Sequence, residues 1–156
     1  MTQELPVGLR FSILHRSFMK QLDALLQERG LTGVQFGVLG QLRRLEEQQA
    51  EVNQRDLEAA TRVTHPTMTE IVKRLEKQGL VVCSPSARDR RYKSIRSTDK
   101  AVALRREMAA GDERVFRELC RGLDESEIAS LLSVTDKMLS NAADRCGQKG
   151  REKSCD

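Results

Sequence analysis

Aromatic residues are scarce in this chain, because only 3% of its 156 residues are Phe, Tyr or Trp and Trp is absent. This scarcity argues against a platform of stacked rings of the kind that binds single-stranded nucleic acid. It also means that no aromatic-lined ligand pocket can be identified from the sequence. We expect the four phenylalanines to lie in the hydrophobic core, and these are Phe11, Phe18, Phe36 and Phe116.

Long apolar runs are also missing. No window of the sequence approaches the roughly 20 uninterrupted apolar residues that a membrane-spanning helix requires. The opening residues MTQELPVGLRFS do not combine a basic segment with an apolar one, so we expect no signal peptide. These absences predict a cytoplasmic protein with no membrane partner.

Motifs for metal binding and catalysis are missing as well. The two histidines, His15 and His65, fall in different predicted elements, which argues against a zinc site. We find no nucleophile–base–acid set and no Gly-rich phosphate loop, so we expect neither a cofactor nor an enzymatic activity. The four cysteines are far apart without a CxxC pair, which favours free thiols, and they are Cys83, Cys120, Cys146 and Cys155.

Charge, in contrast, is abundant and unevenly distributed. Charged residues make up 32% of the chain and the net charge is +4. Residues 61–100 hold a large excess of cations, whereas the rest of the chain has a slight excess of acids. The densest part is the stretch SARDRRYKSI, which runs from Ser86 to Ile95. Such a block is typical of a polyanion-binding site, although charge alone leaves a solvated surface equally open.

Apolar residues at helical spacing predict six helices. Their starts carry capping patterns: T-x-x-Q at Thr32, Asn53 with Asp56, and Asp124 with Glu127. The polar run EEQQAE predicts a loop between the second and third helices, and the polar end of the chain predicts a flexible tail. The expected helices span about 9–29, 33–45, 54–60, 65–78, 99–121 and 125–145.

The third and fourth helices have the pattern of a helix-turn-helix. A short helix and the connector Thr61 to Val63 lead into a second helix whose apolar stripe faces the core. Residues 80–83 and 92–96 then predict two strands joined by the basic loop 84–91. A helix-turn-helix followed by such a hairpin is a winged helix. The expected fold class is therefore mainly α with a small β-hairpin wing.

The exposed side of the fourth helix is suited to a DNA major groove. Threonine hydroxyls can contact bases or phosphates, and His65 can donate to an acceptor such as guanine N7. Lysine and arginine further along the helix suit phosphates. The candidate residues on this helix are Thr64, His65, Pro66, Thr67, Thr69, Glu70, Lys73 and Arg74.

The basic hairpin is suited to a minor groove. A hairpin tip is thin, and a narrow minor groove attracts arginine through its concentrated negative potential. Asp89, two residues before Arg91, is placed to hold that guanidinium in one bidentate pose. The candidate residues of the hairpin are Arg88, Asp89, Arg90, Arg91 and Lys93.

Between Leu31 and Thr98 the sequence resembles the MarR family of winged helix-turn-helix transcriptional regulators. The resemblance rests on four stretches in fixed order: LTGVQFGVLGQL, VNQRDLEAATRV, THPTMTEIVKRLEKQGLV and DRRYKSIRST. It implies a pyramidal homodimer in which Arg91 enters the minor groove, Asp89 orients it, and residues 64–69 open the recognition helix. Glu70, which replaces a cation found in many members, is a departure.

The resemblance also implies a domain organisation and a set of partners. Dimerisation helices are expected at 1–30 and 98–145, a winged helix-turn-helix DNA-binding domain at 31–97, and a flexible tail at 146–156. The implied partners are a second copy of the chain, a palindromic double-stranded DNA operator and a small phenolic or other aromatic effector. The implied function is a transcriptional regulator, specifically a repressor.

Two alternatives remain open at this point. Cys83 lies just before the wing, so a redox-responsive regulator is conceivable if neighbouring arginines lower the pKa of its thiol. An inert thiol in a strand is the simpler interpretation. The second alternative is a winged helix that binds protein and lacks DNA affinity. The cations on both the helix and the hairpin count against it.

Overall fold

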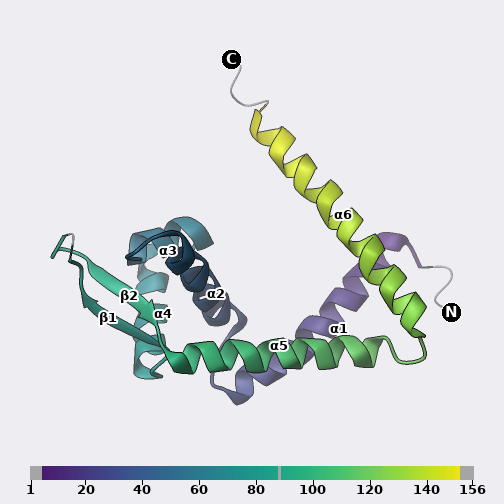
Figure 1. Cartoon of the computed structure of the whole chain (residues 1–156), viewed down its shortest axis with the longest axis horizontal. Coiled ribbons are helices and arrows are strands. Elements are labelled where there is room, and N and C mark those ends of the chain that lie inside the picture. Colours follow the sequence, from purple (N-terminus) through teal and green to yellow (C-terminus); the bar gives the residue numbers. More distant parts are fainter. Residues whose placement is uncertain (1–4, 88, 152–156) are drawn as a thin grey trace. The chain divides into compact units, whose positions relative to one another are not determined.

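The computed structural model describes residues 5–87 and 89–151, without the side chains of 144–151. The chain divides after Val115 into two compact units. No helix in the described part of the chain is long and apolar enough to cross a membrane. The elements are α1 (Val7–Glu28), α2 (Gly33–Gln48), α3 (Gln54–Thr61), α4 (His65–Lys77), β1 (Val81–Pro85), β2 (Lys93–Ser97), α5 (Asp99–Leu119) and α6 (Glu125–Arg151) (Figure 1).

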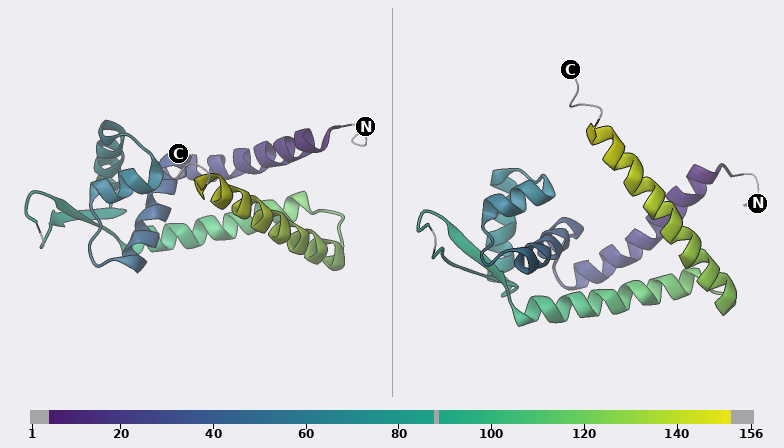
Figure 2. Two further views of the ribbon diagram at one scale, coloured as in Figure 1. Left: turned by 90° about the horizontal axis from the view of Figure 1, so that it is seen from above. Right: turned by 45° about the horizontal axis from the view of Figure 1, so that its top comes forward.

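The first unit contains the expected winged helix. α2, α3 and α4 pack together, and β1 pairs with β2 in an antiparallel hairpin in which Val81 faces Ser97 and Pro85 faces Lys93. Both views in Figure 2 show this hairpin extending away from the three helices. The Ile95 amide donates to the Val52 carbonyl at 2.8 Å, which joins β2 to the segment before α3. The predicted fold class is confirmed.

The hydrophobic core lies where these helices meet the base of the hairpin. The apolar stripe of α4 contributes Met68 and Leu75, and α3 contributes Leu57. Burying a leucine or methionine side chain stabilises a fold by roughly 2 kcal/mol, so these residues hold α4 in place while its other side stays exposed. The largest fully buried side chains are Leu39, Leu42, Leu57, Met68, Leu75, Val38, Val52 and Val81.

Several element boundaries differ from the prediction, and β1 continues to Pro85, into the predicted loop 84–91. α2 continues through Glu46 to Gln48, because this polar run is a good helix former and needs no buried face. Thr61 ends α3 instead of opening the connector, since its hydroxyl donates to the Leu57 carbonyl one turn earlier. α6 includes Cys146 and runs to Arg151, so the predicted tail is helical there, and residues 152–156 lie outside the described part.

Apolar side chains on α1 and α6 are much less buried than those of the winged helix. On α1, Val7, Phe11 and Leu14 expose 67%, 52% and 53% of their surface. The expectation that Phe11 lies in the core is therefore wrong for the single chain, whereas Phe36 packs against the core as expected. On α6, Val134 and Leu139 expose 53% and 63%. Each of these helices carries an apolar face that its own unit does not cover.

Candidate nucleic-acid interface

The turn between α3 and α4 is built from short-range signals. Asn53 and Asp56 form a capping box at the start of α3, with the Asn53 amide donating to Asp56 Oδ2 at 2.8 Å. After α3, Arg62 takes a left-handed conformation with φ of 57°, which reverses the chain. α4 begins at His65 with Pro66 in its first turn, where proline is tolerated. The exposed start of α4 is thus set by the sequence around it.

Gln54 connects α3 to α4 through its side-chain amide. Its Nε2 donates to Thr69 Oγ1 at 2.8 Å and to Glu58 Oε1 at 2.9 Å. The Thr69 hydroxyl in turn donates to the His65 carbonyl at 3.0 Å. Thr69, a predicted DNA-binding residue, therefore takes part in the contact between the two helices.

His65 lies at the exposed start of α4 and contacts Glu58 of α3. The distance from Nδ1 to Glu58 Oε1 is 2.8 Å. The hydrogen bond from Gln54 is the largest cause that holds the pKa of the Glu58 carboxyl below its usual range; burial opposes it, and the hydrogen bond from His65 adds a smaller lowering effect. Because an ionised carboxylate only accepts hydrogen bonds, the proton of a neutral His65 ring sits on Nδ1. Nε2 of the neutral ring is then an acceptor, whereas Nε2 of a protonated ring is a donor, so donation from His65 to guanine N7 stays a prediction.

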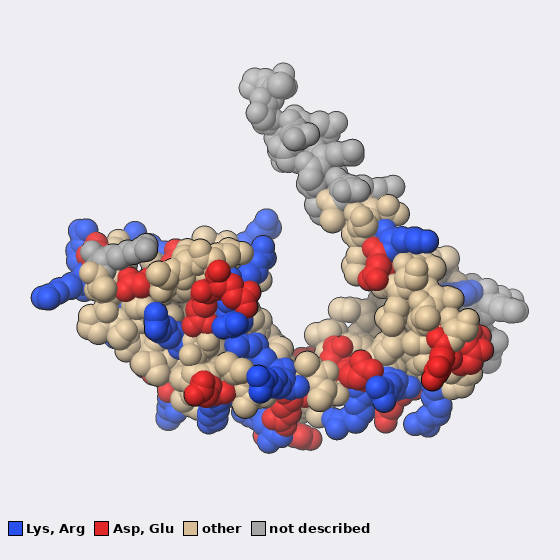
Figure 3. Space-filling model, in the orientation of Figure 1, with Lys and Arg blue, Asp and Glu red and all other residues tan. Residues whose placement is uncertain are grey.

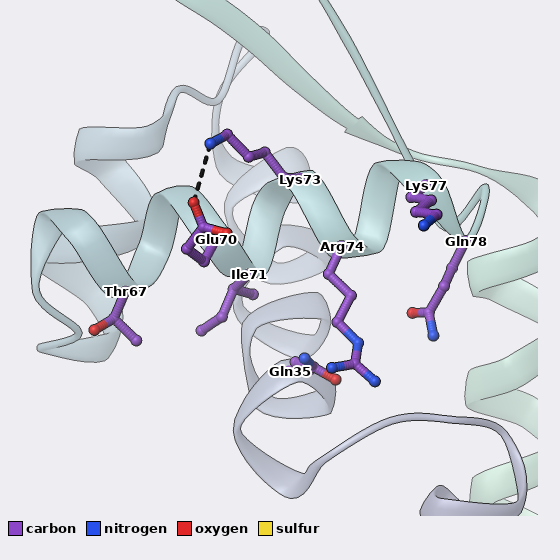
Figure 4. A pocket seen from close by; sticks show the side chains of 8 residues that line it. All are labelled: Gln35, Thr67, Glu70, Ile71, Lys73, Arg74, Lys77 and Gln78. Carbon is purple, nitrogen blue, oxygen red and sulfur yellow. Dashed lines mark hydrogen bonds and ion pairs between the residues drawn. The ribbon is translucent and has the colours of Figure 1, made fainter.

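Further along α4, the exposed side chains border an open cavity of about 740 Å³. Figure 4 shows Lys73 extended toward Glu70 and Arg74 pointing to the other side, toward Gln35 of α2. Lys73 Nζ and Glu70 Oε1 are 3.0 Å apart. Arg74 Nη2 donates to the Gly30 carbonyl at 3.3 Å. Of these two predicted phosphate contacts, Lys73 faces outward, whereas Arg74 is hydrogen-bonded to the segment before α2.

In the hairpin, the carboxylate of Asp89 holds the guanidinium of Arg91. Arg91 Nη2 donates to Asp89 Oδ2 at 2.8 Å, and Nε lies 3.1 Å from both carboxylate oxygens. The arrangement lowers the pKa of Asp89 and raises that of Arg91, chiefly through these hydrogen bonds. The Arg91 side chain remains 84% exposed. The predicted pose of the pair is therefore present, with the guanidinium fixed at one end and open to solvent.

Glutamates from three segments hold the backbone of the hairpin. Glu46 of α2 accepts from the Ser97 amide at 2.7 Å. Glu76 of α4 accepts from the Cys83 amide at 3.1 Å. Glu51, between α2 and α3, accepts from the Ser86 hydroxyl at 2.7 Å and from the Ala87 amide at 3.0 Å. These acids position a cationic hairpin, and the sequence analysis did not identify any of them.

A smaller cavity of about 290 Å³ separates the start of α4 from the hairpin. Its lining includes His65, Arg91, Lys93 and, from α3, Arg55. The Arg55 guanidinium lies 5.0 Å from the centre of the Tyr92 ring, within the range of a cation–π contact. Sequence reasoning missed Arg55, although its place in the first helix of a helix-turn-helix, which crosses the DNA backbone, was an available signal.

Cations therefore gather at the hairpin, with Arg55 of α3 beside it. On the face drawn in Figure 3, Lys and Arg side chains project at the end of the hairpin, whereas along α5 they alternate with acids. Arg90 and Lys93 are exposed beside Arg91. Thr64 and Thr67 are exposed at the start of α4, and their hydroxyl oxygens lie 3.0 Å apart. Arg88, another predicted contact, lies outside the described residues.

Cys83 does not have the lowered pKa that a redox role required. Burial raises the pKa of its thiol to about 11, and the neighbouring Glu76 carboxylate adds to the effect more than Lys93 opposes it. The thiol is therefore protonated at neutral pH, which favours the simpler interpretation of an inert thiol in a strand. Among the residues that the structure describes, no three His, Cys, Asp or Glu side chains group to hold a metal ion.

The chain is similar to known proteins over this unit and beyond it. Residues 29–91 match the model of the MarR family. A point variant of S. aureus MepR bound to an oligodeoxyribonucleotide is 25% identical, with a TM-score of 0.70 over 89% of this chain and 99% of that one. YusO from Bacillus subtilis is 20% identical, with a TM-score of 0.73 over 86% and 92%.

A third solved structure, the reduced form of MarR from E. coli, is 22% identical, with a TM-score of 0.69 over 88% of this chain and 99% of that one. The last two likenesses concern the fold. The family match falls on the helix-turn-helix and the first part of the wing, where the capping boxes, the Arg62 turn and the Asp89–Arg91 pair were found. Residues 29–91 are therefore similar to the MarR family, and over most of its length the chain shares the fold of these solved structures.

Proposed function

We propose that the protein is a dimeric regulator that binds double-stranded DNA in a sequence-specific manner. In this proposal α4 lies in a major groove and Arg91 enters the adjacent minor groove. The observation that carries it is the Arg91 guanidinium, held by Asp89 yet 84% exposed on a thin hairpin beside a helix-turn-helix. A narrow minor groove favours a cation presented in this way. The oligodeoxyribonucleotide bound to the similar MepR variant supports the same partner class.

The other proposed contacts divide into base-reading and phosphate-binding residues. Thr64, His65, Pro66 and Thr67 open α4 and are exposed to base edges. Lys73 on α4 and Arg55 on α3 are placed for phosphates, which set the register without reading sequence. The remaining contacts proposed for the complex are Thr69, Glu70 and Arg74 on α4, and Arg88, Arg90 and Lys93 on the hairpin, with Asp89 as the residue that orients Arg91.

His65 gives the proposal a testable specificity. With its Nδ1 proton directed at Glu58, neutral His65 offers an acceptor at Nε2, which matches an amino group such as adenine N6 or cytosine N4. We expect His65→Ala to change the ranking of DNA sites more than the total affinity. A selection from a random-sequence library, compared between the two proteins, measures this ranking. A uniform loss across all sites would make His65 a phosphate contact.

The dimer is proposed from the apolar faces of α1 and α6. Apolar side chains exposed in a row along a long helix are costly in water, and a second copy of the same chain covers both faces with two-fold symmetry. Two α4 helices of such a dimer reach successive major grooves about 34–36 Å apart. The operator is accordingly palindromic. Binding over a promoter makes the protein a repressor, and transcription in vitro with and without the protein tests this.

A ligand-responsive step is a second proposal, carried by a separate cavity. About 360 Å³ of space lies between the end of α1, the end of α4 and the first turns of α5, with apolar walls from Leu80 and Leu104. Gln78 lines it, and the Oε1 atom of this side chain is buried without a hydrogen-bond partner. The size suits a small aromatic compound. Salicylate is a practical probe, with release of labelled DNA as the measurement.

The main experiment is a titration of duplex DNA across salt concentrations. A DNA-binding protein loses affinity steeply as salt rises, because bound counterions are released. We expect Arg91→Ala to weaken binding by about tenfold to a hundredfold, in line with the loss of a charged hydrogen-bonding group. Arg43→Ala is the control, since Arg43 is an exposed cation paired with Glu47 on α2. A folded protein that shows no duplex binding even at low salt would favour the protein-binding alternative.

A further inference from the structure

A carboxylate of the winged-helix body, that of Glu51, contacts the end of the hairpin. Glu51 lies in the segment between α2 and α3, and its two oxygens accept from the Ser86 hydroxyl and the Ala87 amide. Ser86 is only 8% exposed, so its hydrogen bond to Glu51 is shielded from water, whereas Ala87 is exposed. Hydrogen bonds to an ionised acceptor are stronger than neutral ones, and shielding strengthens them further.

The same hydroxyl continues the connection toward Arg91. The Asp89 amide donates to Ser86 Oγ at 3.2 Å, and the Asp89 side chain holds the guanidinium of Arg91. The Tyr92 amide closes the turn by donating to the Asp89 carbonyl at 3.0 Å. An unbroken chain of hydrogen bonds thus runs from Glu51 through Ser86 and Asp89 to Arg91.

We propose that Glu51 and Ser86 are positioning residues for DNA binding, which fix the loop that presents Arg91 to the minor groove. Without the connection, the loop from 86 to 92 samples many conformations and must be ordered when DNA binds, which weakens affinity. The proposal rests on the proposed function, because it gives Glu51 and Ser86 a role only through Arg91.

The direction in which Glu51→Ala changes DNA affinity distinguishes a positioning role from a purely electrostatic one. Glu51 carries a negative charge near a surface proposed to meet a polyanion. If charge alone mattered, Glu51→Ala would tighten DNA binding. The positioning role requires the opposite, namely weaker binding. Ser86→Ala changes no charge and removes the hydroxyl that links Glu51 to Asp89, so it must weaken binding as well.

The experiment measures affinity for the duplex that the unaltered protein selects from a random-sequence library. We expect Glu51→Ala and Ser86→Ala each to weaken binding by at least about fivefold, as for a lost hydrogen bond to a charged group. Glu51→Gln, which keeps an acceptor for the Ala87 amide, is intermediate. The matched control is Glu47→Ala, which removes an exposed acid from α2 and leaves binding unchanged or tighter.

A double-mutant cycle shows whether the two residues act through Arg91. Glu51→Ala added to Arg91→Ala should cause little further loss, because the loop no longer presents a guanidinium. The Arg91 Nε–H signal in NMR spectra should broaden in Ser86→Ala, while thermal unfolding and sedimentation verify fold and dimer. Should Glu51→Ala fail to fold, Ser86→Ala carries the test alone.

The failures of the two proposals are distinguishable. If Arg91→Ala weakens binding while Glu51→Ala and Ser86→Ala do not, or if the losses are additive in the cycle, the positioning role is overturned. If no duplex is selected, or if Arg91→Ala has no effect, the proposed function fails instead.

Discussion

The winged helix and the two long helices α1 and α6 differ in how far their apolar side chains are buried. Leu39, Leu42 and Leu57 are fully buried among α2, α3 and α4, whereas Leu14 and Leu139 expose about half or more of their surface. Both regions have helical periodicity, so the difference is not one of pattern. The winged helix buries its apolar side chains within one chain, whereas on α1 only Leu26, near the end of the helix, is buried. The winged helix is stabilised within the chain, and we propose that a second copy of the chain covers the exposed apolar faces of α1 and α6.

The largest expected effect is on the stability of the winged helix, after truncation of a core side chain. Leu57→Ala removes a fully buried side chain of α3 and should lower the free energy of unfolding by about 3 kcal/mol. Denaturant titration measures this loss. Val34→Ala on α2 is the control, because Val34 is 58% exposed and its loss should change stability by less than about 0.5 kcal/mol. Equal losses at the two positions would contradict the assigned core.

A charge on the apolar face of α6 should separate the dimer without unfolding the winged helix. Leu139→Glu places a carboxylate in the proposed contact between copies, and we expect dimerisation to weaken by at least about tenfold. Sedimentation equilibrium measures the dissociation constant. Ser140→Glu introduces the same charge outside the apolar stripe and should leave the dimer intact. An unaffected Leu139→Glu dimer would exclude this face of α6 from the interface.

A smaller effect on stability is expected from the N-terminal caps, which also differ between the two regions. α3 begins with a reciprocal capping box, whereas Pro6 before α1 makes no side-chain capping bond. Asn53→Ala should therefore cost about 1 kcal/mol of stability, because the Asp56 amide loses its acceptor. Pro6→Ala should change thermal unfolding much less. A comparable loss at Pro6 would mean that the start of α1 is held by contacts other than a cap.

The smallest expected effect concerns the end of the hairpin, where Asp89 and Arg91 form an ion pair. Arg91 holds the pKa of Asp89 below its usual range. The stability that the Asp89–Arg91 pair contributes is thus fully present above the pKa of Asp89 in the unfolded chain. It is lost as pH falls through the lower pKa that Asp89 has in the folded protein. Carbon-13 NMR of the carboxyl measures this titration. In Arg91→Ala the pKa should rise, and an unchanged value would show that Arg91 is not the cause.

Much of the fold was predictable because its signals are local. The capping residues Thr32 and Asn53 lie three positions from their partners, and Asp89 lies two positions from Arg91. Contacts of this kind join residues that are close together in the sequence, so the local sequence pattern predicts them. The same holds for the apolar stripe of α4, whose period alone indicates which side is buried.

The residues that the sequence analysis missed make contacts across long stretches of chain. Glu51 and Ser86 are 35 positions apart, and Glu46 and Ser97 are 51 apart. Nothing near Glu51 distinguishes it from the other acids of the polar run around it. Its role is visible only once the hairpin folds back beside the segment before α3. The acceptor state of His65 likewise depends on Glu58, which reaches it only through the turn at Arg62.

The sequence by itself determined the helices, the turn, the hairpin and the Asp89–Arg91 pair, since neighbouring residues supply the free energy of each. The tertiary structure decided which glutamates hold the hairpin, where Arg74 and Arg55 point, and that Phe11 is exposed in the single chain. The physical reason is that burial and hydrogen bonding between distant segments depend on how the whole chain packs. No short stretch of the sequence contains that information.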